Sequence, residues 1–190
     1  MKYEAKTFAI PDLKGISSLS INEHLKLYQG YVKHVNHIRE ELDNVNDAYA
    51  RSEMMRRLGF EFGGMRNHEY YFAQFEGGAK ELSDGELSKM LVKQWGSVEK
   101  FIEHFKTVAM TRGVGWAMLY IDRKAGELVS AWVDEQHFGH LADLDIVLGI
   151  DMWEHSYMLD YPPSEKSKYI DAVFANLNWE VVSTRVQGEG

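Results

Sequence analysis

Asp151 and His155 are the two residues whose types and spacing most directly suggest chemistry. They follow an apolar run at residues 146–150 that has the length of a buried strand. If the chain becomes helical from Trp153, a carboxylate at the strand exit and an imidazole four residues later converge on one point. Such a pair makes half of a metal site. On spacing alone, a helix-capping Asp beside a structural His is the commoner arrangement, so the interpretation depends on the other ligands that the chain supplies.

The composition limits those ligands. The chain of 190 residues has no cysteine, which excludes disulfides, thiolate nucleophiles and cysteine-bound zinc or iron–sulfur clusters. A metal would therefore be held by His, Asp or Glu. The sequence contains no HExxH motif, P-loop or GxGxxG motif, so hydrolytic zinc chemistry and nucleotide binding have no support. The histidines are residues 24, 34, 37, 68, 104, 137, 140 and 155.

The bulk properties also exclude several kinds of partner. The formal net charge is -8 and there is no stripe of Lys and Arg, so nucleic acid is not an expected partner. No stretch reaches the roughly 18 consecutive apolar residues of a membrane span, and residues 1–6 lack the apolar run of a secretory signal. We therefore expect a cytoplasmic protein that does not bind membranes. With 45% hydrophobic residues, it can bury a substantial core.

His68 has a sequence setting that favours a buried imidazole. Gly63 and Gly64 precede it and allow its helix to approach another backbone closely, and an aromatic run at residues 70–72 follows it. Those rings could exclude water from the imidazole. Spacing alone is equally compatible with a core histidine in an aromatic stripe.

Several segments resemble the iron/manganese superoxide dismutase family. Residues 151–161, DMWEHSYMLDY, match the pattern DxWEHxYxLxY, and residues 63–72 resemble the family element GGxxNHxxxW. Residues 95–101, 113–117 and 178–180 resemble the elements FGSxExF, GSGWxWL and NWxxV, in the family's order. The resemblance thus spans essentially the whole chain. It implies a superoxide dismutase, in which redox cycling of one iron or manganese ion per subunit converts superoxide into dioxygen and hydrogen peroxide.

The resemblance also implies which residues form the site. The metal would be bound by His24, His68, Asp151 and His155, and Tyr31 would hydrogen-bond toward solvent at the metal.

A further donor would come from the loop at residues 134–140. Counting without a gap from Gly115 favours Gln136, whereas a match to the variant ExHFxxH favours His137. We rank His137 slightly ahead.

The first ligand has two alignments. Aligning from residues 16–21 places His24 in the ligand position, whereas aligning from residues 28–32 places Glu23 there. In a regular helix, a step of seven residues leaves a side chain about 20° from its starting face, and a step of eight about 80°. A plain helix therefore lets His24 share a face with Tyr31. We predict that His24 is the ligand and that Glu23 faces solvent.

Some positions depart from the family pattern. Phe72 replaces a usual Trp, Met158 replaces a gateway Tyr, and Leu27 or Tyr28 replaces a gateway His. Residues 162–165 replace a segment that contains Arg. These changes concern proton delivery and subunit contacts more than metal binding. They leave two alternative functions: another mononuclear metal oxidoreductase of oxidase or oxygenase type, and a non-catalytic metal-binding homologue.

The elements that would position the site predict an α+β fold. An N-terminal helical hairpin, with helices near residues 21–45 and 48–75, precedes a C-terminal lobe of helices around a three-stranded antiparallel sheet. The glycines at 63 and 64 are expected to interrupt the second helix. We place the lobes at residues 1–80 and 81–190. In the second lobe we expect helices at residues 83–94, 97–111 and 165–177, a final helical turn after 179, and strands at 115–121, 128–133 and 146–150.

Glu154 suggests an assembly with a second copy of the chain. The pattern implies a buried carboxylate that, in the family, reaches across a subunit interface to a ligand His. A buried carboxylate without such a partner would be costly. We therefore expect a homodimer or homotetramer, with superoxide as the small-molecule partner.

Overall fold

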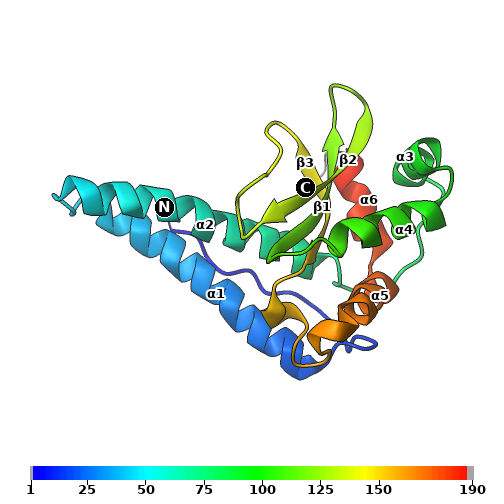
Figure 1. Cartoon of the computed structure of the whole chain (residues 1–190), viewed down its shortest axis with the longest axis horizontal. Coiled ribbons are helices and arrows are strands. Elements are labelled where there is room, and N and C mark those ends of the chain that lie inside the picture. The colour runs from blue at the N-terminus through cyan, green and yellow to red at the C-terminus, as the bar shows by residue number, and fades with distance from the viewer. Residues whose placement is uncertain (1, 188–190) are drawn as a thin grey trace.

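Two long helices open the fold and lie side by side (Figure 1). The computed structural model describes residues 2–187. Helix α1 (Ser18–Glu41) and helix α2 (Ala48–Ala73) form the predicted hairpin, and the extended lead before α1 runs along them. None of the helices described between residues 2 and 187 has both the length and the apolar character that a membrane crossing needs.

Side-chain caps determine where the two helices begin. Ser17 and Asp47 each accept a hydrogen bond from the backbone N–H three residues later, at 3.1 and 2.7 Å. The Ser17 cap places the start of α1 at Ser18. The helix ends at Glu41, whereas the sequence predicted a helix over about residues 21–45. The predicted interruption of α2 is wrong, because the helix continues through residues 63 and 64. The two glycines serve packing instead, as described below.

The three-stranded antiparallel sheet has β1 at its centre. Strand β1 (Gly115–Asp122) lies between β2 (Glu127–Asp134) and β3 (Asp145–Asp151). Trp116 pairs with Asp151 across the two strands, and the N–H of Met152 donates to the carbonyl of Gly115 at 2.8 Å. The sheet register thus places a buried Trp directly beside the end of β3.

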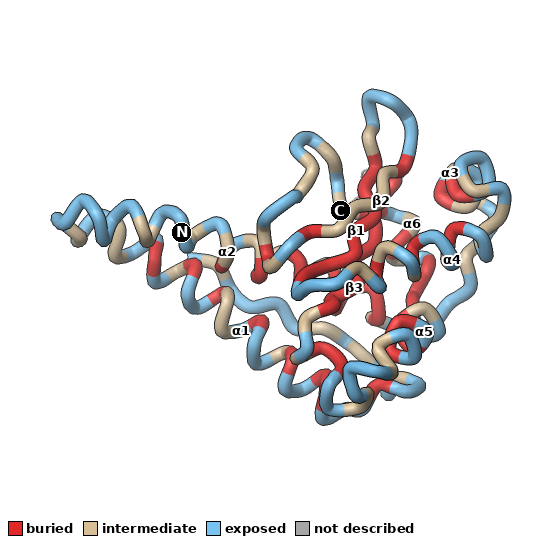
Figure 2. The backbone as a smooth tube through the Cα atoms, in the orientation of Figure 1, coloured by how far each residue is buried: buried red, intermediate tan, exposed pale blue. Residues whose placement is uncertain are grey.

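Four shorter helices surround the sheet: α3 (Glu86–Trp95), α4 (Val98–Ala109), α5 (Lys166–Asn176) and α6 (Trp179–Gln187). Helix α5 follows a short 3-10 helix, η2 (Pro163–Glu165), and α6 is longer than the single helical turn that the sequence predicted. Figure 2 shows that buried residues concentrate in the strands and on the helix faces that meet them. The predicted α+β class is confirmed.

The segment after β3 differs from its prediction. Only Glu154–Ser156 form a short 3-10 helix, η1, in place of a helix from Trp153 onward. Asp151 itself closes this turn, because its Oδ1 accepts from the N–H of Trp153 at 2.9 Å and its carbonyl accepts from Ser156 Oγ at 2.9 Å. Asp151 and His155 therefore converge through a local turn rather than through helical periodicity.

Candidate metal centre

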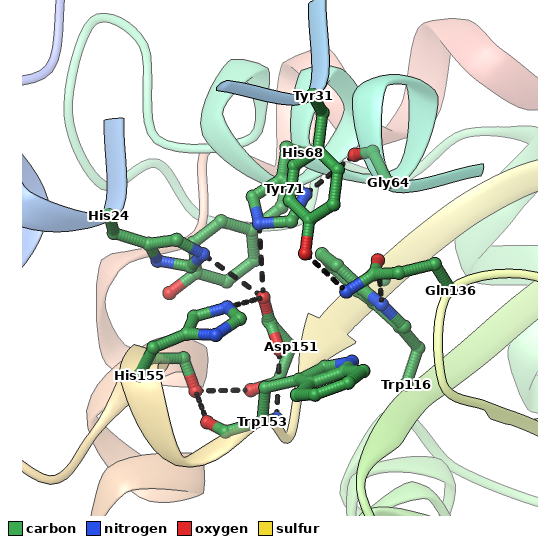
Figure 3. A network of polar contacts seen from close by, with 12 residues as sticks. His24, Tyr31, Gly64, His68, Tyr71, Trp116, Gln136, Asp151, Trp153 and His155 are labelled. Carbon is green, nitrogen blue, oxygen red and sulfur yellow. Dashed lines mark hydrogen bonds and ion pairs between the residues drawn. The ribbon is translucent and has the colours of Figure 1, made fainter. Parts of the chain in front are cut away.

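Three imidazoles surround one carboxylate oxygen where the hairpin meets the sheet (Figure 3). Asp151 Oδ2 lies 3.0 Å from Nε2 of His24, 3.1 Å from Nε2 of His155 and 3.4 Å from Nε2 of His68. The four potential ligand atoms all lie within 4.8 Å of one another. They come from α1, α2, the end of β3 and η1, so the folded chain brings the four predicted ligands together.

Glu23 does not take part in this cluster. Its side chain is 48% exposed and lies 2.6 Å from the Nζ of Lys26, whereas His24 is buried. Because α1 is a regular helix here, the seven-residue step from His24 to Tyr31 keeps both side chains on the face that meets α2. The structure therefore agrees with the His24 alignment.

Hydrogen bonds fix the orientation of His68. Its Nδ1 lies 2.6 Å from the carbonyl of Gly64, which can only accept, so Nδ1 carries the proton. Nε2 then has an unprotonated lone pair, and it is buried without a hydrogen-bond partner. This lone pair faces the carboxylate oxygen of Asp151. A cation bound by both His68 Nε2 and Asp151 Oδ2 would stabilise these two electron-rich atoms. His68 is thus oriented as a metal ligand has to be.

Burial and charge hold His24, His68 and Asp151 in their metal-binding protonation states. Burial lowers the pKa of His68 to about 3, with a further contribution from His24. Burial also lowers the pKa of His24, which Asp151 only partly offsets. Burial alone would raise the pKa of Asp151, but His155 and His24 together hold it below its usual value. Neutral imidazoles and an ionised carboxylate are the forms that bind metal.

Gln136 connects the sheet to Tyr31. The indole Nε1 of Trp116 donates to Gln136 Oε1 at 3.0 Å, and Gln136 Nε2 donates to Tyr31 Oη at 3.1 Å. The Trp116 bond fixes which end of the amide points at Tyr31. The Tyr31 ring lies 5.0 Å from the ring of His68, so this chain of hydrogen bonds ends beside the candidate ligands.

The ranking of His137 ahead of Gln136 is not supported by their positions. The His137 ring lies 3.9 Å from the Phe138 ring and 5.8 Å from the Phe60 ring, so it packs on these two rings rather than on Tyr31 or a candidate ligand. The two candidates differ by one position along the loop, and the side chain that turns inward is that of Gln136. Gln136 is buried and His137 is only partly so.

Two glycines and an asparagine of α2 hold this arrangement in place. A Cβ on Gly64 would lie 2.5 Å from the Tyr31 ring, and one on Gly63 would lie 2.2 Å from the carbonyl of Gln136. Asn67, which is buried, donates from Nδ2 to that same carbonyl at 3.0 Å. The close approach predicted from the glycine pair therefore occurs on two sides, against α1 and against the loop that carries Gln136.

Trp116 and Asn67 were not among the predicted site residues. Both lie inside quoted motifs, at residues 113–117 and 63–72. Their positions were visible, but their hydrogen bonds to Gln136 depend on strand register and on how the loop folds back. The Trp directly after Gly115, at the start of a strand, was the available signal for Trp116.

Fold and site together define the class of proteins that can hold one metal ion between three His and one Asp. A family model described as iron/manganese superoxide dismutases, C-terminal domain, matches residues 83–185. The superoxide dismutase [Fe] of Aquifex pyrophilus is 33% identical over 98% of this chain and 92% of its own length. The superoxide dismutase [Mn] of Corynebacterium diphtheriae is 33% identical over 70% of this chain and 67% of its own length. The chain belongs to the iron/manganese superoxide dismutase family.

Proposed function

We propose that this chain is a superoxide dismutase in which His24, His68, Asp151 and His155 bind one iron or manganese ion. The observation that carries the proposal is the convergence of their four ligand atoms within 4.8 Å. The names of the related proteins, superoxide dismutase [Fe] and [Mn], support the same activity and both metals. When bound, such an ion supplies the one-electron chemistry that oxidises one superoxide and reduces the next.

The side chains around the ligands supply a proton at a defined atom. Reducing superoxide to hydrogen peroxide consumes protons, and Tyr31 is the hydroxyl nearest to the candidate ligands in the Gln136 chain. Burial raises the pKa of Tyr31, with Asp151 adding to the effect, so the phenol keeps its proton at neutral pH. Because Gln136 donates to Tyr31 Oη, the proton of Tyr31 is available to another acceptor. We therefore assign Tyr31 to proton donation and Gln136 to holding it in place.

The proposal is tested by measuring metal content and superoxide consumption on one preparation. We expect about one iron or manganese per chain and rapid consumption, both lost in Asp151→Ala. A preparation that binds metal at these residues but does not consume superoxide favours the oxidase or oxygenase alternative. A chain that binds no iron or manganese contradicts the proposal.

We also propose that the protein forms a homodimer or a homotetramer. Glu154 was expected to be buried, but it is exposed on the single chain, in η1. Large apolar side chains are exposed nearby in the sequence, Met158 at 50% and Leu159 at 55%. An exposed carboxylate beside a ligand and apolar neighbours suits a partner contact. Light scattering at micromolar concentration tests this, and a monomer there contradicts it.

Two further expectations stay predictions from the sequence. They are a cytoplasmic location and the division into lobes at residues 1–80 and 81–190.

A further inference from the structure

Arg57 holds its guanidinium over the outer part of the aromatic wall beside the metal centre. Its Cζ lies 3.8 Å from the centroid of the Phe60 ring. That ring in turn lies 6.0 Å from the ring of Tyr31 and 6.3 Å from the ring of Trp153. Trp153 stacks on His155 at 5.7 Å. Arg57 is therefore one ring away from the tyrosine and the tryptophan that contact two of the candidate ligands.

This wall lies on the side from which the centre reaches solvent. The side chains of His24, His68 and Asp151 are at most 1% exposed, whereas that of His155 is 21% exposed. Tyr31 and Phe60 are also partly exposed. A small molecule that comes from solvent to the centre past these residues passes the guanidinium of Arg57.

A buried carboxylate fixes the direction of this cation. Nε of Arg57 donates to Glu61 Oε1 at 2.8 Å. The Glu61 side chain is 4% exposed and that of Arg57 is 52% exposed, so the negative group faces inward and the positive group faces solvent. Within residues 2–187, neither Nη atom of Arg57 makes a hydrogen bond. A planar guanidinium with two outward nitrogens suits a small anion.

The neighbouring arginine differs in this respect. Arg56 directs both Nε and Nη2 to Glu53, at 2.9 and 2.7 Å, which occupies its fork with a surface carboxylate. Arg57 also acts electrostatically on the site itself, because it partly counters the increase in the pKa of Tyr31 that burial, Asp151 and Glu61 cause. Its charge is therefore felt at Tyr31.

A chain of net charge -8 repels an anionic substrate at long range. A local positive charge at the entrance raises the encounter rate by concentrating anions there. We propose that Arg57 is the residue that docks and steers small anions, including superoxide, to the metal centre, with Glu61 and Phe60 holding it in position. The identification of superoxide as the anion rests on the proposed function, whereas anion docking by Arg57 does not.

Azide, a small monoanion, is the probe for this proposal. Its dissociation constant on the metal-loaded protein is measured by optical titration from low ionic strength to about 1 M salt, where the Debye length is about 3 Å. We expect Arg57→Gln to weaken azide binding by roughly threefold to tenfold at low ionic strength. Glu61→Gln should strengthen it, and Arg57→Lys should lie between wild type and Arg57→Gln, because it keeps the charge and loses the planar fork. The differences should disappear in high salt.

Lys106→Gln is the matched control. Lys106 forms an exposed ion pair with Asp171 at 2.6 Å, on α4 and α5, so its loss changes the net charge equally at another place. Equal azide affinity in Arg57→Gln and Lys106→Gln overturns the proposal. A loss in Arg57→Lys as large as in Arg57→Gln also overturns it, because packing rather than charge would then be responsible. Azide binding that depends on Arg57 in a protein that does not consume superoxide leaves the docking role standing and removes the proposed function.

Discussion

His24 Nε2 lies 3.0 Å from Asp151 Oδ2, although 127 residues separate them in the sequence. This contact joins the first helix to the last residue of β3, and the other two candidate ligands meet at the same oxygen. The centre is therefore also a junction between the hairpin and the sheet. Substitution of a ligand should therefore affect both metal binding and the packing of the hairpin against the sheet.

Replacing His24 and Glu23 separately tests the assignment of the first ligand. We expect His24→Ala to lose most of the bound metal, because the centre then has three ligands from the protein and an emptied position in a buried site. Glu23→Ala should keep its metal, because it removes only an exposed contact with Lys26. Metal content per folded chain is the measurement. Loss of metal in the Glu23 variant alone would show that the helix register is wrong.

Gln136 and His137 should behave differently on substitution. Gln136→Leu leaves the buried Nε1 of Trp116 without an acceptor and removes the donor to Tyr31. We expect superoxide consumption to fall by about tenfold or more and stability to fall by roughly 1–3 kcal/mol, with metal content kept. His137→Gln is the adjacent control and should change activity by less than about twofold, because the His137 ring packs on Phe60 and Phe138 and not on Tyr31 or a candidate ligand. An activity loss confined to the His137 variant would reverse the assignment.

Gly64 and Gly30 give a paired test of the close contact between α1 and α2. A Cβ on Gly64 would lie 2.5 Å from the Tyr31 ring, whereas one on Gly30 has nothing within 4 Å. Gly64→Ala should therefore destabilise the protein by about 1–3 kcal/mol. Gly30→Ala should stabilise it by about 0.5–1 kcal/mol, because Ala has a higher helix propensity than Gly and meets no neighbour there. Urea unfolding of the two variants measures this. Similar stability in both would contradict the tight packing of Tyr31 on α2.

The sequence predicted the elements well, because these depend on local patterns, and motifs with fixed spacing picked out the four candidate ligands that the structure brings within 4.8 Å of one another. Ser17 and Asp47 are caps that mark helix starts, and the run before Asp151 has the pattern of a buried strand. The ranking of His137 ahead of Gln136 does not agree with their positions, because a loop has no periodicity to indicate which side chain turns inward. The exposure of Glu154 and the stacking of Arg57 on Phe60 are tertiary features of the same kind.

The metal-free protein should lose stability as the pH falls below about 6.5. The pKa of His68 drops from 6.5 in the unfolded chain to about 3 in the folded protein, because burial disfavours the imidazolium. Between these values the unfolded chain binds more protons, so the free energy of unfolding decreases as pH decreases. Burial also lowers the pKa of His24, so protonation of His24 destabilises the folded protein in the same way. Asp151, whose folded pKa is below its usual value, adds a loss only below about pH 4, where its unfolded form takes up a proton.

Urea unfolding of the metal-free protein between pH 7.5 and 4.5 measures this dependence. Each histidine that folds in the neutral form contributes a slope of about 1.4 kcal/mol per pH unit below pH 6.5. His68→Gln should remove one such contribution, because an amide can still donate toward the Gly64 carbonyl without taking up a proton. His37→Gln is the control, because His37 is exposed on α1. If His68→Gln and His37→Gln show the same pH dependence as the wild type, His68 is not held neutral by the fold, and the metal-binding form of the site would have to be set by the metal itself.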